Sequence, residues 1–204
     1  MTKKEISKKI QNILIKLYPN PKIPLTHTDN FTLLIAVMLS ARCTDVRVNK
    51  ITPLLFAEAD TPQKMVKLPV PEIEEIIRPC GLSPQKAKAI LGTAEAIINK
   101  YHGKVPNTFE ELESLPGVGH KTASVVMWQA FQKNAFPVDT HIHRLAKRWG
   151  LSEAKNVKET EKDLKELFPK KDWGIMAMRI IFFGREYCPA LRHNKDDCPI
   201  CSWL

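Results

Sequence analysis

The chain has 204 residues, enough for one large or two small domains that each bury a hydrophobic core. Hydrophobic residues make up 44% of it and charged residues 26%, a balance that excludes an intrinsically disordered protein. Thirty-one lysines and arginines stand against 22 acidic residues, for a net charge of +9. This excess favours a polyanionic partner, although a basic surface that only keeps the protein soluble would show the same balance.

No segment predicts export or membrane insertion. Residues 1–12 contain lysines but no apolar stretch after them, unlike a secretory signal. The longest apolar run, 31–41, is shorter than the roughly 20 residues that span a bilayer. We therefore expect a cytoplasmic protein. Since the cytosol disfavours disulfides, its five cysteines are candidate metal ligands or buried thiols.

Helical patterns dominate the first half of the chain. Apolar residues recur on one face of 4–18, whereas 31–41 is apolar throughout and predicts a buried helix. Further helices are expected over 45–58, 61–68, 69–81 and 83–103. Thr61 and Ser83, each followed by proline, are the expected N-caps of two of them, and Gly103 ends the last.

The second half continues in the same way. Helices are expected around 108–115, from the hairpin to about residue 130, and over 139–149, 155–168 and 173–187. No alternating run of convincing length predicts a strand. The fold class is therefore all-α. Only the tail from Cys188 to Leu204 lacks helical periodicity, and it is rich in cysteines, prolines and charged residues.

The segment LPGVGHKTAS, residues 115–124, predicts a tight turn that leads into a helix. Gly117 and Gly119 permit positive φ and a close backbone approach, which leaves the amides from Val118 to Lys121 at a helix start. Such amides, with the helix dipole, suit a phosphate. Thr108 caps a short helix before the turn, so the unit is helix, hairpin, helix.

Three segments together resemble the endonuclease III family of helix-hairpin-helix DNA repair glycosylases. LPGVGHKTA resembles the hairpin signature of that family, LLIAVMLSARCTDVRVNK (33–50) its LLSAQxTD helix, and VDTHIHRLAKR (138–148) its VDTHVxR segment. The order, the spacing and the cysteine-bearing tail agree over essentially the whole chain.

The resemblance implies a fold of two helical domains with the substrate cleft between them. One would comprise residues 27–135 with the hairpin, and the other residues 1–26 plus 136–204 with an iron-sulfur loop. The implied activity is that of a bifunctional DNA glycosylase and AP lyase. It would act as a monomer on duplex DNA with damaged bases or abasic sites, remove oxidised pyrimidines and cleave the strand by β-elimination.

Lys121 and Asp139 are the catalytic residues that the resemblance implies. Lys121 would attack C1′ of the damaged nucleotide as a neutral amine, which the positive end of a helix and a DNA-filled cleft favour. Asp139 would position that amine and relay protons. From the residues alone, Lys121 also suits a solvated surface position and Asp139 a helix N-cap.

The resemblance also implies contacts with DNA at the hairpin and in two loops. The hairpin residues Gly117, Val118, Gly119 and His120 would bind phosphate, and His141 would lie near the cleft. Arg42 and Leu82 match the side chains that fill the gap left by a flipped nucleotide in the family. Arg42 departs from the usual glutamine, and Leu82 also suits an ordinary hydrophobic contact at a helix turn.

The cysteines at 188, 198 and 201 predict a metal site, and the resemblance implies a [4Fe-4S] cluster there. This sequence departs from the family twice, because the first gap is longer than six residues and a fourth cysteine is missing. Three alternatives stay open: the chain shown lacks a final segment, His193 or Asp197 replaces the cysteine, or the site is degenerate and empty. Zinc in a Cys₃His shell is the main alternative metal.

Two other functions stay open on the sequence. A monofunctional glycosylase of the adenine type would share the fold, but that branch carries a hydroxyl residue in place of Lys121. A non-catalytic DNA-binding protein would use the hairpin alone and would not depend on Lys121 or Asp139.

Overall fold

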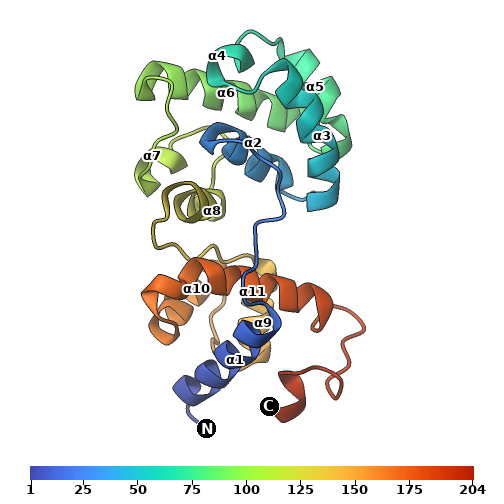
Figure 1. Cartoon of the computed structure of the whole chain (residues 1–204), viewed down its shortest axis with the longest axis vertical. Coiled ribbons are helices and arrows are strands. Elements are labelled where there is room, and N and C mark those ends of the chain that lie inside the picture. The colour runs from blue at the N-terminus through green and yellow to red at the C-terminus, as the bar shows by residue number, and fades with distance from the viewer. The chain divides into compact units, whose positions relative to one another are not determined.

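The computed structural model describes all 204 residues and consists of helices and loops only, which confirms the all-α prediction (Figure 1). The α-helices of the first half are α1 (Lys3–Leu17), α2 (Asn30–Ser40), α3 (Asp45–Glu58), α4 (Pro62–Met65), α5 (Val70–Ile77) and α6 (Ser83–Tyr101). Those of the second half are α7 (Phe109–Glu113), α8 (His120–Phe131), α9 (Thr140–Arg148), α10 (Val157–Leu167) and α11 (Trp173–Glu186). Three short 3₁₀ helices are η1 (Arg78–Cys80), η2 (Lys170–Asp172) and η3 (Cys201–Trp203). None of the helices is both long and apolar enough to cross a membrane.

The chain divides into two compact units. Residues Pro24–Lys133 form one, here called the central unit. The terminal unit combines Met1–Ile23 with Asn134–Leu204. The two ends of the chain therefore share one hydrophobic core, although they are far apart in the sequence.

Helix α2 forms the core of the central unit. Every residue from Phe31 to Leu39 is buried, as expected for a helix that is apolar all round. It packs against α3, α6 and α8, which surround it in Figure 1. Asp29 caps its start, because the Asp29 carboxylate accepts a 2.8 Å hydrogen bond from the Thr32 amide.

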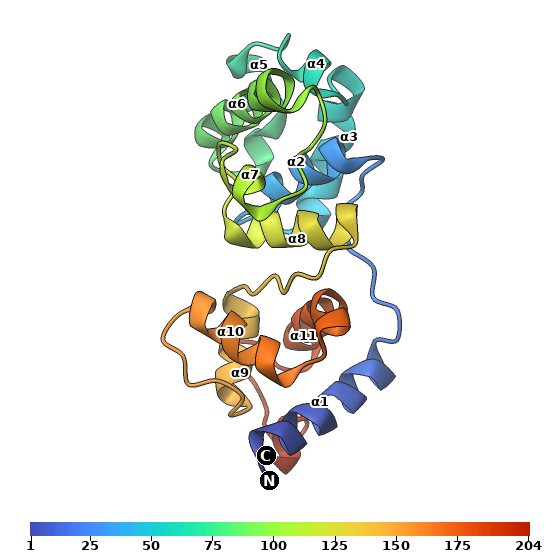
Figure 2. The same ribbon diagram turned by 90° about the vertical axis from the view of Figure 1, so that its left-hand side faces the viewer.

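The terminal unit is built on α9 and α11, with α1 packed along α11 and α10 (Figure 2). Trp149, Phe136 and Phe183 are its largest fully buried side chains. The buried Arg179 side chain fastens the end of α1, since its Nε donates to the Tyr18 carbonyl and its Nη2 to the Pro19 carbonyl, both at 2.8 Å.

Most predicted helix starts are found where the sequence places them, with one correction. Thr61 caps α4 as predicted, its hydroxyl accepting from the Lys64 amide at 3.3 Å. Ser83 is not the N-cap of α6. Leu82 occupies that position with a left-handed φ of 54°, and Ser83 is the first helical residue. The reason is that Gly81 and Leu82 both adopt positive φ, so the chain turns one residue before the serine.

Candidate nucleic-acid and metal sites

The turn between α7 and α8 lies directly against α6. Gly117 has a φ of +74°, and a Cβ there would lie 2.7 Å from the Cβ of Ala89 in α6. One residue earlier, the Pro116 carbonyl accepts a 2.8 Å hydrogen bond from the Thr93 hydroxyl. Only glycine satisfies both the conformation and the close approach at residue 117.

Helix α8 begins at this turn with no side-chain cap. Gly119 is its N-cap residue and has no side chain to offer the first-turn amides. The start of the helix therefore keeps its positive end for an anion. Lys121 lies in this first turn and is exposed, so its amine is open to a ligand from solution.

The His120 side chain is held against α7. Its Nδ1 lies 2.6 Å from Glu113 Oε1, and its ring stacks on Phe109 with centroids 5.3 Å apart. The DNA contact predicted for His120 would thus come from a residue that α7 already orients.

Arg42 and Leu82 share an uncommon backbone conformation. Both have a φ of 54° and lie in loops, Arg42 after α2 and Leu82 before α6. Left-handed φ at a residue other than glycine costs on the order of 1–3 kcal/mol and is concentrated at functional sites. Leu82 is also 50% exposed, which is unusual for a leucine. Their predicted role at the DNA stays a prediction, and the strain supports it.

Lys86 connects these two loops, and sequence reasoning missed it. Its buried ammonium donates to the carbonyls of Leu39 at 2.8 Å and Cys80 at 3.2 Å. Leu39 lies in the last turn of α2, just before Arg42, and Cys80 closes η1, just before Leu82. One signal was present in the sequence, because Lys86 shares the buried face of α6 with Ile90.

Burial has the expected effect on the ionisable groups around Lys86. It lowers the pKa of the Lys86 ammonium, although the neighbouring thiols of Cys43 and Cys80 oppose the shift. Burial and the neighbouring Cys43 thiol raise the pKa of the Cys80 thiol to about 11. Cys80 is therefore a neutral thiol at pH 7.

Asp139 caps α9 in the terminal unit. Its Oδ1 accepts hydrogen bonds from the amides of His141 and Ile142, both at 2.9 Å. The N-cap expectation is confirmed, and Oδ1 is engaged in it. Partly buried His141 follows, with its Nδ1 3.3 Å from Arg144 Nη1.

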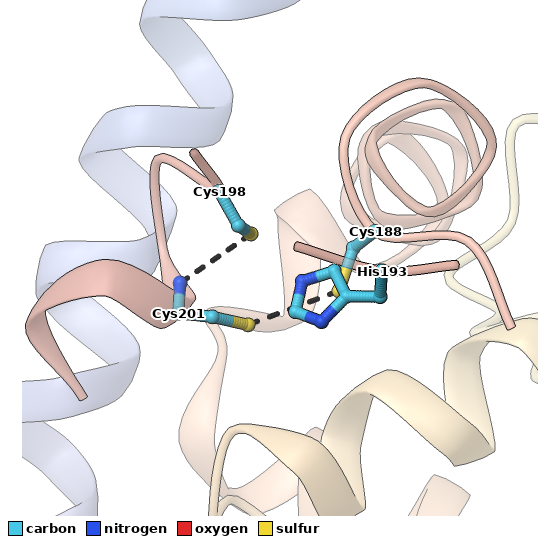
Figure 3. A group of neighbouring side chains, drawn as sticks. All are labelled: Cys188, His193, Cys198 and Cys201. Carbon is cyan, nitrogen blue, oxygen red and sulfur yellow. Dashed lines mark hydrogen bonds between the residues drawn. The ribbon is translucent and has the colours of Figure 1, made fainter. Parts of the chain in front are cut away.

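The three C-terminal cysteines converge with a histidine. The ligand atoms of Cys188, His193, Cys198 and Cys201 all lie within 4.8 Å of one another (Figure 3). The three cysteines are buried, and Cys188 Sγ lies 3.8 Å from Cys201 Sγ. This group could hold a metal ion. His193, rather than Asp197, is thus the non-cysteine residue that joins the thiols.

Burial makes Cys188 and Cys201 weaker acids than a free thiol until a metal binds. It raises the pKa of the Cys201 thiol to about 12, and it raises that of Cys188. Because metals bind the thiolate, uptake at this group releases protons and weakens as the pH falls.

Comparison with known proteins agrees with this geometry. Residues 35–170 match the model of the HhH-GPD superfamily base excision DNA repair proteins. Endonuclease III of Bacillus subtilis (strain 168) is 42% identical over 187 residues, which cover 91% of this chain and 85% of the relative. The chain belongs to the endonuclease III family.

Two solved structures extend the endonuclease III likeness to three dimensions. One is a non-covalent endonuclease III–DNA complex, with a TM-score of 0.94, 42% identity, and coverage of 99% of this chain and 94% of the other. The second is a trapped endonuclease III–DNA covalent intermediate, with a TM-score of 0.94 and 42% identity. It covers 98% of this chain and 94% of the other. The predicted two-domain glycosylase fold is therefore present.

Gly117→Ala tests the close approach of the hairpin to α6. We expect it to lower the free energy of unfolding by about 2–4 kcal/mol, because alanine resists left-handed φ and its methyl would overlap Ala89. Denaturant unfolding measures this. Gly119→Ala is the matched control, since its Cβ meets nothing within 4 Å. Equal losses in the two variants would contradict this account of Gly117.

Lys86→Met tests the connection between the two loops. It leaves the carbonyls of Leu39 and Cys80 without a donor, so we expect the free energy of unfolding to fall by about 1–3 kcal/mol. Lys88→Met, at an exposed position of the same helix, should change it by less than about 0.5 kcal/mol. If both variants unfold at the same denaturant concentration as the unaltered protein, the buried ammonium contributes nothing to the free energy of unfolding.

Proposed function

We propose that this member of the endonuclease III family is a bifunctional DNA glycosylase and AP lyase of base excision repair. The position of Lys121 carries the proposal, since the exposed amine lies in the first turn of α8, directly after the helix-hairpin-helix turn. A relative at 42% identity is endonuclease III, and one similar structure is a trapped covalent complex of endonuclease III with DNA. Damaged bases and abasic sites in duplex DNA are the substrate class.

The chemistry proposed for Lys121 is nucleophilic. Its neutral amine attacks C1′ of the damaged nucleotide, and the bond to the base breaks as the base departs with the electron pair and takes up a proton. Loss of the amine proton and opening of the sugar ring give a Schiff base. Removal of a proton from C2′ then expels the 3′ phosphate by β-elimination, which cleaves the strand.

Asp139 is proposed to hold and move the proton in these steps. Its Oδ1 is occupied by two amides at the start of α9, whereas no hydrogen bond to Oδ2 is found. That second oxygen is the one left to exchange a proton with the substrate. The two amide bonds would fix the carboxylate in orientation.

The proposed DNA contacts divide into two kinds. Gly117, Val118 and Gly119 would present the uncapped start of α8 to a phosphate, with His120 beside them. Arg42 and Leu82, held in strained loops, would fill the space of the extruded nucleotide. His141 would contact DNA near Asp139. Oxidised pyrimidines are the proposed bases, on the strength of the family relation.

The Cys/His group is proposed as a metal centre of this enzyme. The cysteines and the family relation support a metal at this group, and the resemblance implies that it is a [4Fe-4S] cluster. The ligands that lie within reach of one another are Cys188, Cys198, Cys201 and His193. The glycosylase and lyase steps proposed above involve none of these four side chains.

Borohydride trapping tests Lys121. Mixed with duplex DNA that carries one abasic site and then reduced, the protein should give a covalent complex on a denaturing gel. Lys121→Ala should abolish the complex and lower lyase turnover by about a thousandfold or more, since the nucleophile itself is removed, with near-normal DNA affinity. Lys67→Ala, at another exposed lysine of the central unit, is the control and should trap normally.

Two outcomes would contradict the bifunctional proposal. Protein that releases a base but never traps would be a monofunctional glycosylase. Protein that binds the duplex and neither releases a base nor cleaves it, with the Lys121→Ala variant indistinguishable, would be a DNA-binding protein without catalysis.

Asp139 has a structural and a proposed chemical role, and two substitutions separate them. Asp139→Asn keeps a capping side-chain oxygen, so the free energy of unfolding should change by less than about 0.5 kcal/mol, while glycosylase activity falls at least about a hundredfold. Asp139→Ala should lose that activity and also about 1 kcal/mol of stability. Full activity in Asp139→Asn would leave Asp139 as a helix cap only.

A further inference from the structure

We infer that the C-terminal group binds a single zinc ion through Cys188, His193, Cys198 and Cys201, in place of the cluster that the family resemblance predicts. The identity of the metal does not affect the proposed repair reaction, so the two can be tested separately.

The spacing of the ligand atoms suits one tetrahedral ion. Zinc binds cysteine sulfur at about 2.3 Å, which places two sulfurs of a tetrahedral site about 3.8 Å apart. Cys188 Sγ and Cys201 Sγ are 3.8 Å apart, and no ligand atom in the group is more than 4.8 Å from another. In a four-iron cluster each ligand binds a different iron at its own corner, so the ligand atoms must lie further apart than around one ion.

The donor set points the same way. The Nε2 atom of His193 is buried and has no hydrogen-bond partner in the protein, which is unfavourable unless a ligand occupies it. Figure 3 shows its imidazole beside the pair formed by Cys188 and Cys201. Three thiolates and one imidazole are a standard structural zinc shell, and Cys198 and Cys201 have the two-residue gap typical of such sites.

The surroundings of the sulfurs balance the charge of such a site. Three thiolates and Zn²⁺ carry a net charge of −1, and the Arg148 guanidinium donates to Cys188 Sγ at 3.1 Å. Arg148 is itself fixed by a 3.1 Å hydrogen bond to the Pro189 carbonyl. The Cys201 amide donates to Cys198 Sγ at 3.4 Å. Hydrogen bonds of this kind orient metal ligands and stabilise the thiolate form.

Metal analysis of the full chain tests the inference. The protein should be produced without a histidine tag in medium that supplies both iron and zinc, and purified once in air and once without oxygen. We expect about one zinc per chain in both preparations, no stoichiometric iron or acid-labile sulfide, and no absorbance near 400 nm. Four irons with labile sulfide in the oxygen-free preparation would overturn the inference, as would protein that holds no metal.

Variants of His193 test the fourth ligand. His193→Ala should weaken zinc binding on the order of a hundredfold or more, as judged by competition with a chromophoric chelator, because even residues that only support a ligand cost tenfold to a hundredfold. His102→Asn, at an exposed histidine of the central unit, should bind zinc unchanged, and asparagine tolerates the left-handed φ of that residue.

Cobalt substitution keeps the test decisive if His193→Ala does not fold. Co²⁺ in the unaltered protein should give the visible bands of a tetrahedral site with three thiolates. In His193→Cys the sulfur-to-cobalt charge-transfer absorption should rise by about a third, as a fourth thiolate joins three. Unchanged spectra and zinc affinity in His193→Cys would show that His193 is not a ligand.

Discussion

The close contact between the hairpin backbone and α6 is the constraint on which the proposed chemistry depends. Gly117 lies so near Ala89 that no side chain fits between them, and the Pro116 carbonyl is bonded to Thr93. This contact fixes the point at which α8 begins. It therefore fixes the position of Lys121, in the first turn of the helix, and presents the uncapped helix start to any anion. A catalytic lysine on a mobile loop would lack this preorganisation.

The loops that hold Arg42 and Leu82 in the central unit combine strained backbone with one buried charge. Arg42 and Leu82 hold left-handed backbones, which fold stability alone does not favour. The Lys86 ammonium bonds the carbonyls that precede both loops. Burying a lysine is itself costly, so the pair of carbonyl bonds must offset that cost. The arrangement stabilises a particular loop geometry more than the core, as expected where loops meet a ligand.

In the terminal unit, the tail from Cys188 to Leu204 has too few apolar residues to fold on its own. Arg179 fastens the end of α1, and Lys9 lies 3.7 Å from the centre of the Trp203 ring, so the first helix covers the last turn of the chain. The three buried cysteines lie in the same core as Trp149. A metal bound there would replace missing hydrophobic contacts with coordinate bonds and would tie residues 188–201 to α9 through Arg148.

The sequence by itself determined the helices, the turn and the chemistry of its candidate residues. Periodicity located α1 and α3 to within a residue, and the glycines of 115–119 predicted the turn, because these signals are local. Only the tertiary structure decided which distant groups meet. It placed His193 rather than Asp197 among the cysteines, made Lys86 a buried connection, and moved the N-cap of α6 from the predicted Ser83 to Leu82. Such outcomes depend on long-range packing, which no short window of sequence encodes.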